Sequence, residues 1–377
     1  MAERQPSKLH VASSNLVSRS IDPAAGGPDA LRLAALRLRT ALDRVIRPTP
    51  GLADDVEALS AAYRAGTPPM RARGFVHDER TAAAYAAARM PATFAALGRA
   101  LLEGALAMPG GPPRSLLDVG AGTGAASWAA GAIWPGLETV TLIDREPAML
   151  LLGRRLAAAG EGEGPLARAD WRLGTAGIAG PDLPVADLVV AGYVLGEVDD
   201  PSRARLVETA WAAARGALVL VEPGSPAGFA RILAARESLM AAGAAIVAPC
   251  PGNVPCPVRG PAWCHFLTRL DRSPLQRRAK GADRSWEDEP FSYVVASRAA
   301  GRPAPRVVLG RPRHRPGRVE LRVCTLDGLA EPTISRRHGP AWHVARDLEW
   351  GDRVGPTVAD HLAADPPADP PALIVEH

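Results

Sequence analysis

Residues 116–124 read LLDVGAGTG, a short apolar run that ends in three glycines spaced two residues apart. The apolar run predicts a buried strand, and Gly120, Gly122 and Gly124 let the backbone turn sharply and approach a ligand closely. The residues that follow, through Trp134, predict a helix whose unpaired N–H groups and positive dipole end face the turn. This strand–turn–helix unit predicts a nucleotide-type binding loop.

Strands and helices continue to alternate beyond this loop. Such a series implies an α/β fold with a parallel, doubly wound sheet. Strands are predicted at 139–144, 167–173, 187–195 and 217–224, and helices at 146–159, 202–215 and 227–242. Before the loop, apolar residues at helical spacing predict helices at 29–46, 54–64 and 81–108, the last interrupted by Pro91. Further on, short strands are predicted at 286–298, 306–309 and 319–325.

Three acidic residues and a tryptophan sit where a nucleoside cofactor would be held. Asp118 precedes the glycines; it would repel a pyrophosphate but would suit the amino group of a methionine moiety. Asp144, at the end of the second strand, can bind both ribose hydroxyls. Asp170 and Trp171 could meet an adenine by hydrogen bonding and stacking. The set resembles the S-adenosylmethionine site of class I methyltransferases, and the alternative is a glycine-rich turn in a domain that has lost its cofactor.

Catalytic chemistry is not evident from the sequence. The segment after the fourth strand, AGYVLGEV (191–198), contains no Asn/Asp-Pro-Pro-aromatic turn, and the sheet region contains no cysteine that could serve as a nucleophile. Tyr193 and Glu197 are the polar candidates, although packing and solvent exposure explain them equally well. Methyl transfer is therefore permitted, with no catalytic residue assigned and enzyme activity left open.

All four cysteines lie in the last third of the 377-residue chain. They are Cys250, Cys256, Cys264 and Cys324. Four thiols suit either a tetrahedral zinc ion or a [4Fe–4S] cluster. The intervals of five and seven residues between the first three are looser than zinc knuckles usually are, although His265 could serve as a zinc ligand. Uncommitted thiols are the third interpretation.

Charge is distributed unevenly along the chain. Residues 259–318 contain 14 Lys or Arg against 5 Asp or Glu, on a chain whose net charge is only +4. This stretch suggests a polyanion-binding face, with a solvated arginine-rich surface as the alternative. No uncharged apolar run is long enough to cross a membrane, and the first residues do not resemble a secretory signal. We therefore expect a reducing compartment, in which metal binding is favoured over disulfides.

Several segments together resemble the methyltransferase-like small-ribosomal-subunit family of bacteria and mitochondria. They are CPGNVPCP (250–257), WCHFLTRLDRSPLQRRAKG (263–281), WEDEPFSYVVASR (286–298) and VCT (323–325), together with LLDVGAGTGAASWA (116–129). The resemblance covers about residues 30 to 350. It implies a class I methyltransferase fold, a [4Fe–4S] cluster on the four cysteines, and association with the small ribosomal subunit. Gly252 and Pro290 depart from the family pattern, which usually has histidine and lysine there.

The basic residues flank the last two cysteines. A cluster that joins 250–264 to Cys324 would bring both basic runs to one surface, where arginine forks could bind the phosphates of folded ribosomal RNA. The predicted RNA-binding residues are Arg269, Arg272, Arg277, Arg278, Lys280, Arg311, Arg313, Arg315 and Arg318.

These observations predict five regions. They are a disordered tail (1–28), a helical N-terminal region (29–112), an S-adenosylmethionine-binding domain (113–245), a four-cysteine, β-rich RNA-binding module (246–358) and a second disordered tail (359–377). The predicted function is a ribosomal-RNA-binding assembly or translation factor on a methyltransferase fold, acting as a monomer in the cytoplasm, or alternatively in the mitochondrial matrix. An active rRNA methyltransferase and a small-molecule methyltransferase with structural zinc are the rival functions.

Overall fold

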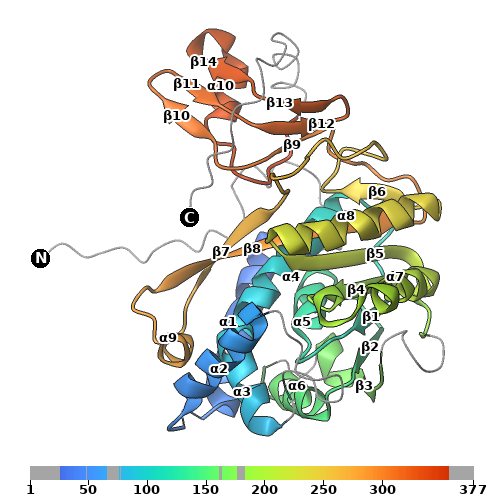
Figure 1. Cartoon of the computed structure of the whole chain (residues 1–377), viewed down its shortest axis with the longest axis vertical. Coiled ribbons are helices and arrows are strands. Elements are labelled where there is room, and N and C mark those ends of the chain that lie inside the picture. Colours follow the sequence, from blue (N-terminus) through green and yellow to red (C-terminus); the bar gives the residue numbers. More distant parts are fainter. Residues whose placement is uncertain are drawn as a thin grey trace, which may run out of the picture.

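The computed structural model describes residues 26–47, 49–65, 76, 78–160, 164–175 and 183–355. The two predicted tails therefore lie almost wholly outside the described residues. Figure 1 shows a large part built around one sheet and a smaller β-rich part formed by C-terminal residues, drawn in orange and red. Within the described ranges, no helix has both the length and the apolar character that crossing a membrane requires.

Four helices precede the first strand in the part of the chain that the structure describes. They are α1 (Pro28–Val45), α2 (Leu52–Ala65), α3 (Glu79–Ala88) and α4 (Met90–Ala107). A capping box starts α3, because the Asp78 carboxylate accepts the Thr81 N–H at 2.8 Å and the Thr81 hydroxyl accepts the Asp78 N–H at 3.2 Å. The helical segment is interrupted at Arg89. Pro91 then lies in the first turn of α4, where the missing N–H of proline costs little. The predicted interruption of this helical segment is confirmed.

One eight-stranded sheet forms the centre of the large part. Its strands are β1 (Ser115–Val119), β2 (Thr139–Asp144), β3 (Asp170–Leu173), β4 (Ala186–Gly192), β5 (Ala214–Pro223), β6 (Ala245–Ala248), β7 (Phe266–Asp271) and β8 (Trp286–Ser297). The order is β3-β2-β1-β4-β5-β8-β6, with β7 paired to β8. Strands β1 to β5 are parallel, and β8 runs antiparallel between β5 and β6. The predicted doubly wound sheet is confirmed.

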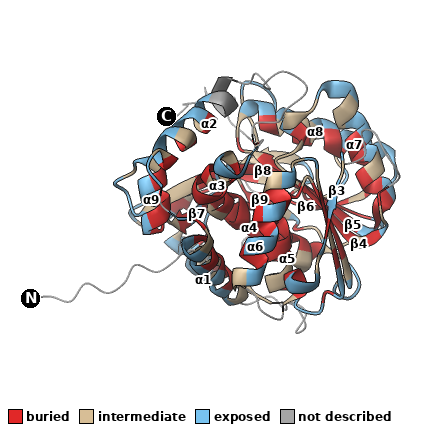
Figure 2. Cartoon of the chain, turned by 90° about the horizontal axis from the view of Figure 1, so that it is seen from below, coloured by how far each residue is buried: buried red, intermediate tan, exposed pale blue. Residues whose placement is uncertain are grey.

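Helices cover both faces of this sheet because its strands are apolar on both sides. In β5, Val219 and Val221 pack with α1, α4 and the two helices α5 (Ala125–Ile133) and α6 (Pro147–Gly160). The intervening Leu218 and Leu220 pack against α7 (Asp200–Ala213) and α8 (Pro226–Ala241). Figure 2 shows the central strands β4 and β5 mostly as buried, with exposed residues on the outer sides of the helices.

The sheet extends beyond the predicted domain boundary at residues 245/246. Strands β6 and β8 belong to it, although both come from the segment assigned to a separate module. The boundary therefore cuts through one sheet, because β8 returns to pair with β5 over Ala217 to Pro223. Strands β7 and β8 also form an arm with α9 (Pro274–Lys280) at its tip, and α9 packs against α2 and α3.

The C-terminal module begins after β8 and has a core of its own. Its elements are β9 (Arg306–Val308), β10 (Arg313–Arg315), β11 (Arg318–Glu320), β12 (Val323–Thr325), β13 (Gly328–Ala330), β14 (Thr333–Ser335) and α10 (Pro340–Ala345). They form two small sheets of order β10-β11-β14 and β13-β12-β9 around Val308, Val319, Val323 and Ile334. The predicted single strand at 319–325 is therefore two strands that belong to different sheets.

A buried ion-pair network attaches the end of this module to α4. Arg353 lies 2.9 Å from the Glu103 carboxylate, and Arg99 lies 3.3 Å from Glu103 and 3.7 Å from Asp352. The four side chains are at most 11% exposed. Buried charges are tolerated only when they are paired, so each member depends on the others.

Replacing Glu103 with alanine should therefore destabilise the protein. The change leaves two buried guanidinium groups without their shared carboxylate, which typically costs about 3–5 kcal/mol. Urea unfolding should reveal a lower midpoint. Glu138→Ala is the matched control, because Glu138 pairs with Arg114 on the surface, and its midpoint should match that of the parent. Equal midpoints for the two variants would contradict the assigned role of the network.

Candidate functional site

The glycine turn lies at the carboxyl end of β1. Gly120, Gly122 and Gly124 have φ angles of +66°, +56° and +86°, a region that is accessible to glycine at little cost. The N–H groups of Gly120 and Ala121 donate to the Ile143 carbonyl at 2.9 and 3.0 Å. These bonds tie the turn to the end of β2 and make its backbone the wall of a pocket.

Asp144 lies beside this turn. Its carboxylate accepts hydrogen bonds from the N–H groups of Gly122 (2.7 Å) and Glu146 (2.9 Å). A carboxylate offers about four acceptor positions, so further positions are available to a ligand. Burial raises the pKa of Asp144, and the two backbone hydrogen bonds oppose that rise.

The pocket opens where the strand order reverses between β1 and β4, the usual ligand position in open α/β sheets. It contains about 800 Å³ of space, a volume that includes solvent at its open side. Of the seven predicted cofactor residues, Gly120, Gly122 and Asp144 line it. Sequence reasoning missed several other lining residues, which include Tyr85, Arg145, Glu146, Met149 and Thr175.

Asp118 does not line the pocket, contrary to the prediction. It alternates with Leu117 and Val119 along β1 and therefore faces the side of the sheet that α5 covers. It is 1% exposed and accepts the Ser127 N–H at 3.1 Å and the Ser127 hydroxyl at 2.7 Å. Its carboxyl group attaches the strand to α5, and burial raises its pKa to about 7.

Asp170 and Trp171 are likewise outside the pocket. The Asp170 side chain is 54% exposed and pairs with Arg172. Trp171 is buried between the turn and α6, so close that a Cβ on Gly124 or Gly153 would meet its ring at 2.9 or 2.3 Å. The predicted adenine contacts are thus wrong, because the indole points into the core. Gly124 packs against the same ring and is therefore part of this core contact.

Tyr193 takes part in a network that joins three distant segments. It has a φ of +61°, an uncommon angle for a residue other than glycine, at the end of β4 beside the pocket. Its hydroxyl donates to Glu289 of β8 at 3.2 Å, and Arg89 binds the same carboxylate at 2.9 Å. Burial raises the pKa of Tyr193 well above its ordinary value. The hydroxyl is therefore held as a neutral donor.

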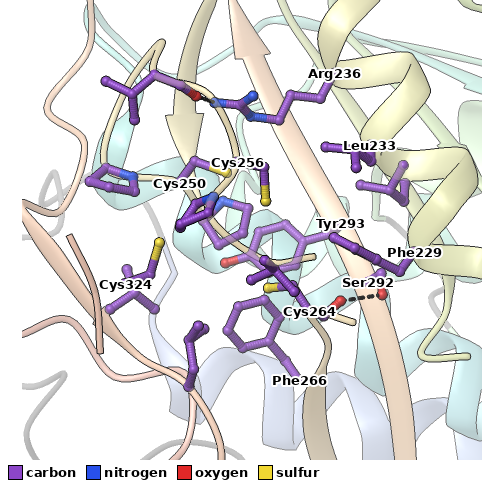
Figure 3. A pocket seen from close by; sticks show the side chains of 18 of the residues that line it. Phe229, Leu233, Arg236, Cys250, Cys256, Cys264, Phe266, Ser292, Tyr293 and Cys324 are labelled. Atoms are coloured by element: carbon purple, nitrogen blue, oxygen red, sulfur yellow. Dashed lines mark hydrogen bonds between the residues drawn. The ribbon is translucent and has the colours of Figure 1, made fainter. Parts of the chain in front are cut away.

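The four cysteines line one pocket between α8, β7, β8 and the module strand β12 (Figure 3). Three come from the loop that leads from β6 to β7, and Cys324 comes from β12, where it stands opposite Val307 and Leu329. The Cys264 carbonyl accepts the Ser292 hydroxyl of β8 at 2.8 Å. Residues 60 positions apart in the chain thus bring their thiols to a common space.

Polar side chains hold this loop in place from behind. The Arg236 guanidinium of α8 donates to the carbonyls of Gly252 (3.0 Å) and Val254 (2.6 Å). The Asn253 side chain accepts the Ile246 N–H at 2.7 Å. Because the main body fixes the loop, its cysteines face the module in a defined orientation.

Three of the four thiols lie in an environment that disfavours their ionised form. Burial raises the pKa of Cys250, of Cys264 and of Cys324, the last to about 12, and mutual repulsion adds to each rise. Among the described residues, no three His, Cys, Asp or Glu side chains are arranged to hold a single metal ion. His265 stacks on Trp263 at a centroid distance of 5.3 Å. The cysteines share a pocket without forming the tight shell of one ion.

Most of the predicted RNA-binding residues on the arm are neutralised internally. Arg269 binds Asp288 through two hydrogen bonds of 2.7 and 2.8 Å, and Arg311 approaches the same carboxylate at 3.4 Å. Arg272 and Lys280 share Glu287, at 2.9 and 2.6 Å. The other predicted residues are exposed: Arg277, Arg278, Arg313, Arg315 and Arg318.

The two basic runs meet at Asp288, which pairs with Arg269 of the first run and with Arg311 of the second. The rest of each run lies apart from the other. The α9 arginines lie beside α2 and α3, whereas β10 and β11 lie in the C-terminal module at the other end of the molecule (Figure 1). The basic segment therefore extends in two directions from a shared point at Asp288.

The strand order, with the antiparallel strand β8 between β5 and β6, and the glycine turn beside Asp144 define a class I methyltransferase fold. The chain belongs to the family described as mitochondrial small ribosomal subunit Rsm22, which matches residues 79–355. The resemblance noted from its motifs is confirmed at that level.

Individual relatives agree with this family. The chain is similar to the human ribosome assembly protein METTL17, mitochondrial, with 32% identity over 303 residues. The match covers 73% of this chain and 63% of that protein, so the chain spans less than two thirds of its relative.

Solved methyltransferase structures resemble the chain more distantly. An O-methyltransferase family protein from Burkholderia thailandensis has 15% identity and a TM-score of 0.40, covering 66% of this chain and 69% of that one. Magnesium protoporphyrin IX methyltransferase from Synechocystis PCC 6803 has 13% identity and a TM-score of 0.36, covering 65% and 100%. Values this low carry no argument about activity or substrate.

Asp118 should make stability depend on pH. Its folded pKa of about 7 exceeds the ordinary 3.8, so as the pH rises the unfolded chain loses this proton first. Stability present near pH 4 is then lost towards pH 7, by up to about 1.4 kcal/mol per pH unit. Asp118→Asn, which stays neutral, should flatten this slope in urea unfolding at several pH values.

Asp187→Asn provides the control for this measurement. Some burial opposes the shift, but hydrogen bonds to the backbone and to Ser115 lower the pKa of Asp187. Its contribution to the free energy of unfolding therefore changes below about pH 4. That variant should keep the parent slope between about pH 4.5 and 7. A slope unchanged in Asp118→Asn would show that Asp118 is ionised throughout.

Proposed function

We propose that this chain is a small-ribosomal-subunit assembly factor that binds ribosomal RNA, on a methyltransferase fold that holds S-adenosylmethionine and a [4Fe–4S] cluster. The observation that carries the proposal is the common pocket lined by all four cysteines, which come from two separate segments of the chain. The family description and the name of the human relative support the ribosomal partner. Both names are mitochondrial, which favours the mitochondrial alternative; the cytoplasmic prediction has no support from them.

The donor set favours a cluster over a single zinc ion. Four thiols in a largely apolar pocket are ligands for either centre, and a cationic centre would relieve the raised pKa values of Cys250, Cys264 and Cys324. Zinc–sulfur bonds of about 2.3 Å require thiolates about 3.8 Å apart, and the described cysteines form no such shell. A cubane cluster is wider and its ligands stand farther apart. Cys250, Cys256, Cys264 and Cys324 would hold it.

When bound, the cluster would supply four iron–thiolate bonds that cross-link the loop to the module. The chain's own residues prepare that link: Arg236 fixes the loop backbone, and β12 presents Cys324 between β9 and β13. The link therefore adds to the Glu103 network, which attaches the same module at a different point. This pair of attachments supports a structural role for the cluster.

Protein purified without oxygen should contain about four iron and four sulfide per chain. Cys324→Ser should lose most of this iron, because one thiolate of four is removed. Leu326→Ser is the matched control; it places the same side chain on the neighbouring exposed turn and should retain the iron. One zinc and no iron in the parent protein would favour the zinc alternative, and a metal-free parent protein would contradict both.

The pocket beside the glycine turn supports cofactor binding more strongly than catalysis. Gly120, Gly122 and Asp144 could hold the ribose and methionine parts of S-adenosylmethionine. The Tyr193 hydroxyl, however, is bonded to a carboxylate that Arg89 already neutralises, so it is poorly placed as a general base. We therefore favour a sensing or stabilising role for the cofactor pocket over a catalytic one. An active rRNA methyltransferase is the second candidate, because Glu197 also lines the pocket.

Calorimetry should detect S-adenosylmethionine binding to the parent protein and a loss of at least about tenfold in affinity for Asp144→Ala. Asp170→Ala, which changes an exposed carboxylate outside the pocket, should bind normally. In the same preparation, labelled S-adenosylmethionine and immature small subunits should yield no methylated RNA. Methylation that Asp144→Ala abolishes would favour the enzymatic alternative.

A further inference from the structure

We infer that the chain meets RNA phosphates through the β10–β11 hairpin and the turn after β14, rather than through the whole basic segment. This inference rests on the proposed function and names the surface which that function would use. The hairpin arginines, as we call them, are Arg313, Arg315, Arg318, Arg336 and Arg337. Two of them, Arg336 and Arg337, were not among the residues predicted to bind RNA.

Three of these arginines converge on one turn. Pro316 and Gly317 join β10 to β11, with Gly317 at a φ of +75°. Arg315 and Arg318 stand directly opposite each other in the ladder on either side of this turn. The Arg336 N–H donates to the Gly317 carbonyl at 3.1 Å, and its side chain passes 3.9 Å from the place of a Cβ on Gly317. All five hairpin arginines are exposed.

The protein compensates the charge of the hairpin only in part, through Glu320, which pairs with Arg318 and stands opposite Arg313 in the ladder. Like charges directly opposite in a ladder are unfavourable. The nearest carboxylate, Glu320, lies 3.5 Å from Arg318. Among the described residues, Arg313, Arg315 and Arg336 form no ion pair. A surface that keeps such repulsion is stabilised by binding anions, and arginine forks match phosphate oxygens.

The arm offers a contrasting case. Its basic side chains Arg269, Arg272 and Lys280 are already bound to Asp288 and Glu287. Binding phosphate there would require breaking these pairs first, which subtracts from any gain. Arg277 and Arg278 on α9 are exposed without such partners in the described part of the chain, so they form a matched pair against which the hairpin can be tested.

The chemistry of the hairpin fits a nucleic acid better than a protein partner. Its outward residues are arginines and His314, and the module's exposed large apolar side chains, Leu326 and Val344, belong to other elements. Protein interfaces usually have an apolar centre. Folded RNA presents rows of phosphates that can be bound without reading bases. A stretch of folded small-subunit RNA is therefore the partner we assign.

Two double charge reversals test this assignment, because each changes the net charge equally. Arg313→Glu with Arg315→Glu should weaken binding to in vitro transcribed small-subunit ribosomal RNA by about tenfold or more. It should also reduce the slope of log affinity against log salt by about two. Arg277→Glu with Arg278→Glu should stay within about twofold of the parent. Both variants should retain the parent's iron content and thermal midpoint, which establishes that they fold.

A milder pair of substitutions tests whether the charge reversal has merely unfolded the hairpin. Arg313→Lys with Arg315→Lys keeps the charge but removes the forks, and should keep the salt slope while losing a few-fold in affinity. Equal losses in the hairpin and α9 reversals, or a larger loss in the α9 reversal, would overturn the inference and leave the proposed function intact. A parent protein that binds this RNA no better than it binds transfer RNA would overturn the proposed function itself.

Discussion

The insertion of β8 between β5 and β6 is the constraint on which both sites depend. It closes the edge of β5 over seven residue pairs, and β6 joins the sheet through it. The same strand carries Glu289, which binds Tyr193 beside the first pocket, and Ser292, which holds the backbone of Cys264. Two pockets with different chemistry therefore share one support, because β8 lines the cysteine pocket and binds Tyr193 at the pocket beside the glycine turn.

The sequence predicted the parts whose signal is local. The strand–turn–helix at 115–133, the parallel strands and the break before Pro91 follow from periodicity, glycine and proline. Contacts that depend on the partner of a strand were harder to predict. Trp171 was expected at the pocket because it follows a strand, yet the pleat turns it into the core. Asp118 was misassigned for the same reason, since a one-residue alternation decides which face a side chain meets.

Non-local pairing explains the other differences. Nothing near Tyr85 or Glu289 indicates that helices from the N-terminal region and a strand almost 200 residues later adjoin the glycine turn. The pairing of arginines with Glu287 and Asp288 could not be read from net charge, because charge counts do not reveal which groups are bound internally. The grouping of the cysteines, by contrast, was expected from their number and position, since four thiols in a chain of this size have few other uses.

The late position of β8 has a consequence for synthesis on the ribosome. Strand β5 is complete at Pro223, but its partner residues run from Phe291 to Ser297. At about 5–20 residues per second, the nascent sheet waits several seconds or longer with an open edge. An unpaired edge is a template for aggregation, so the emerging chain is exposed to this hazard until β8 pairs with β5.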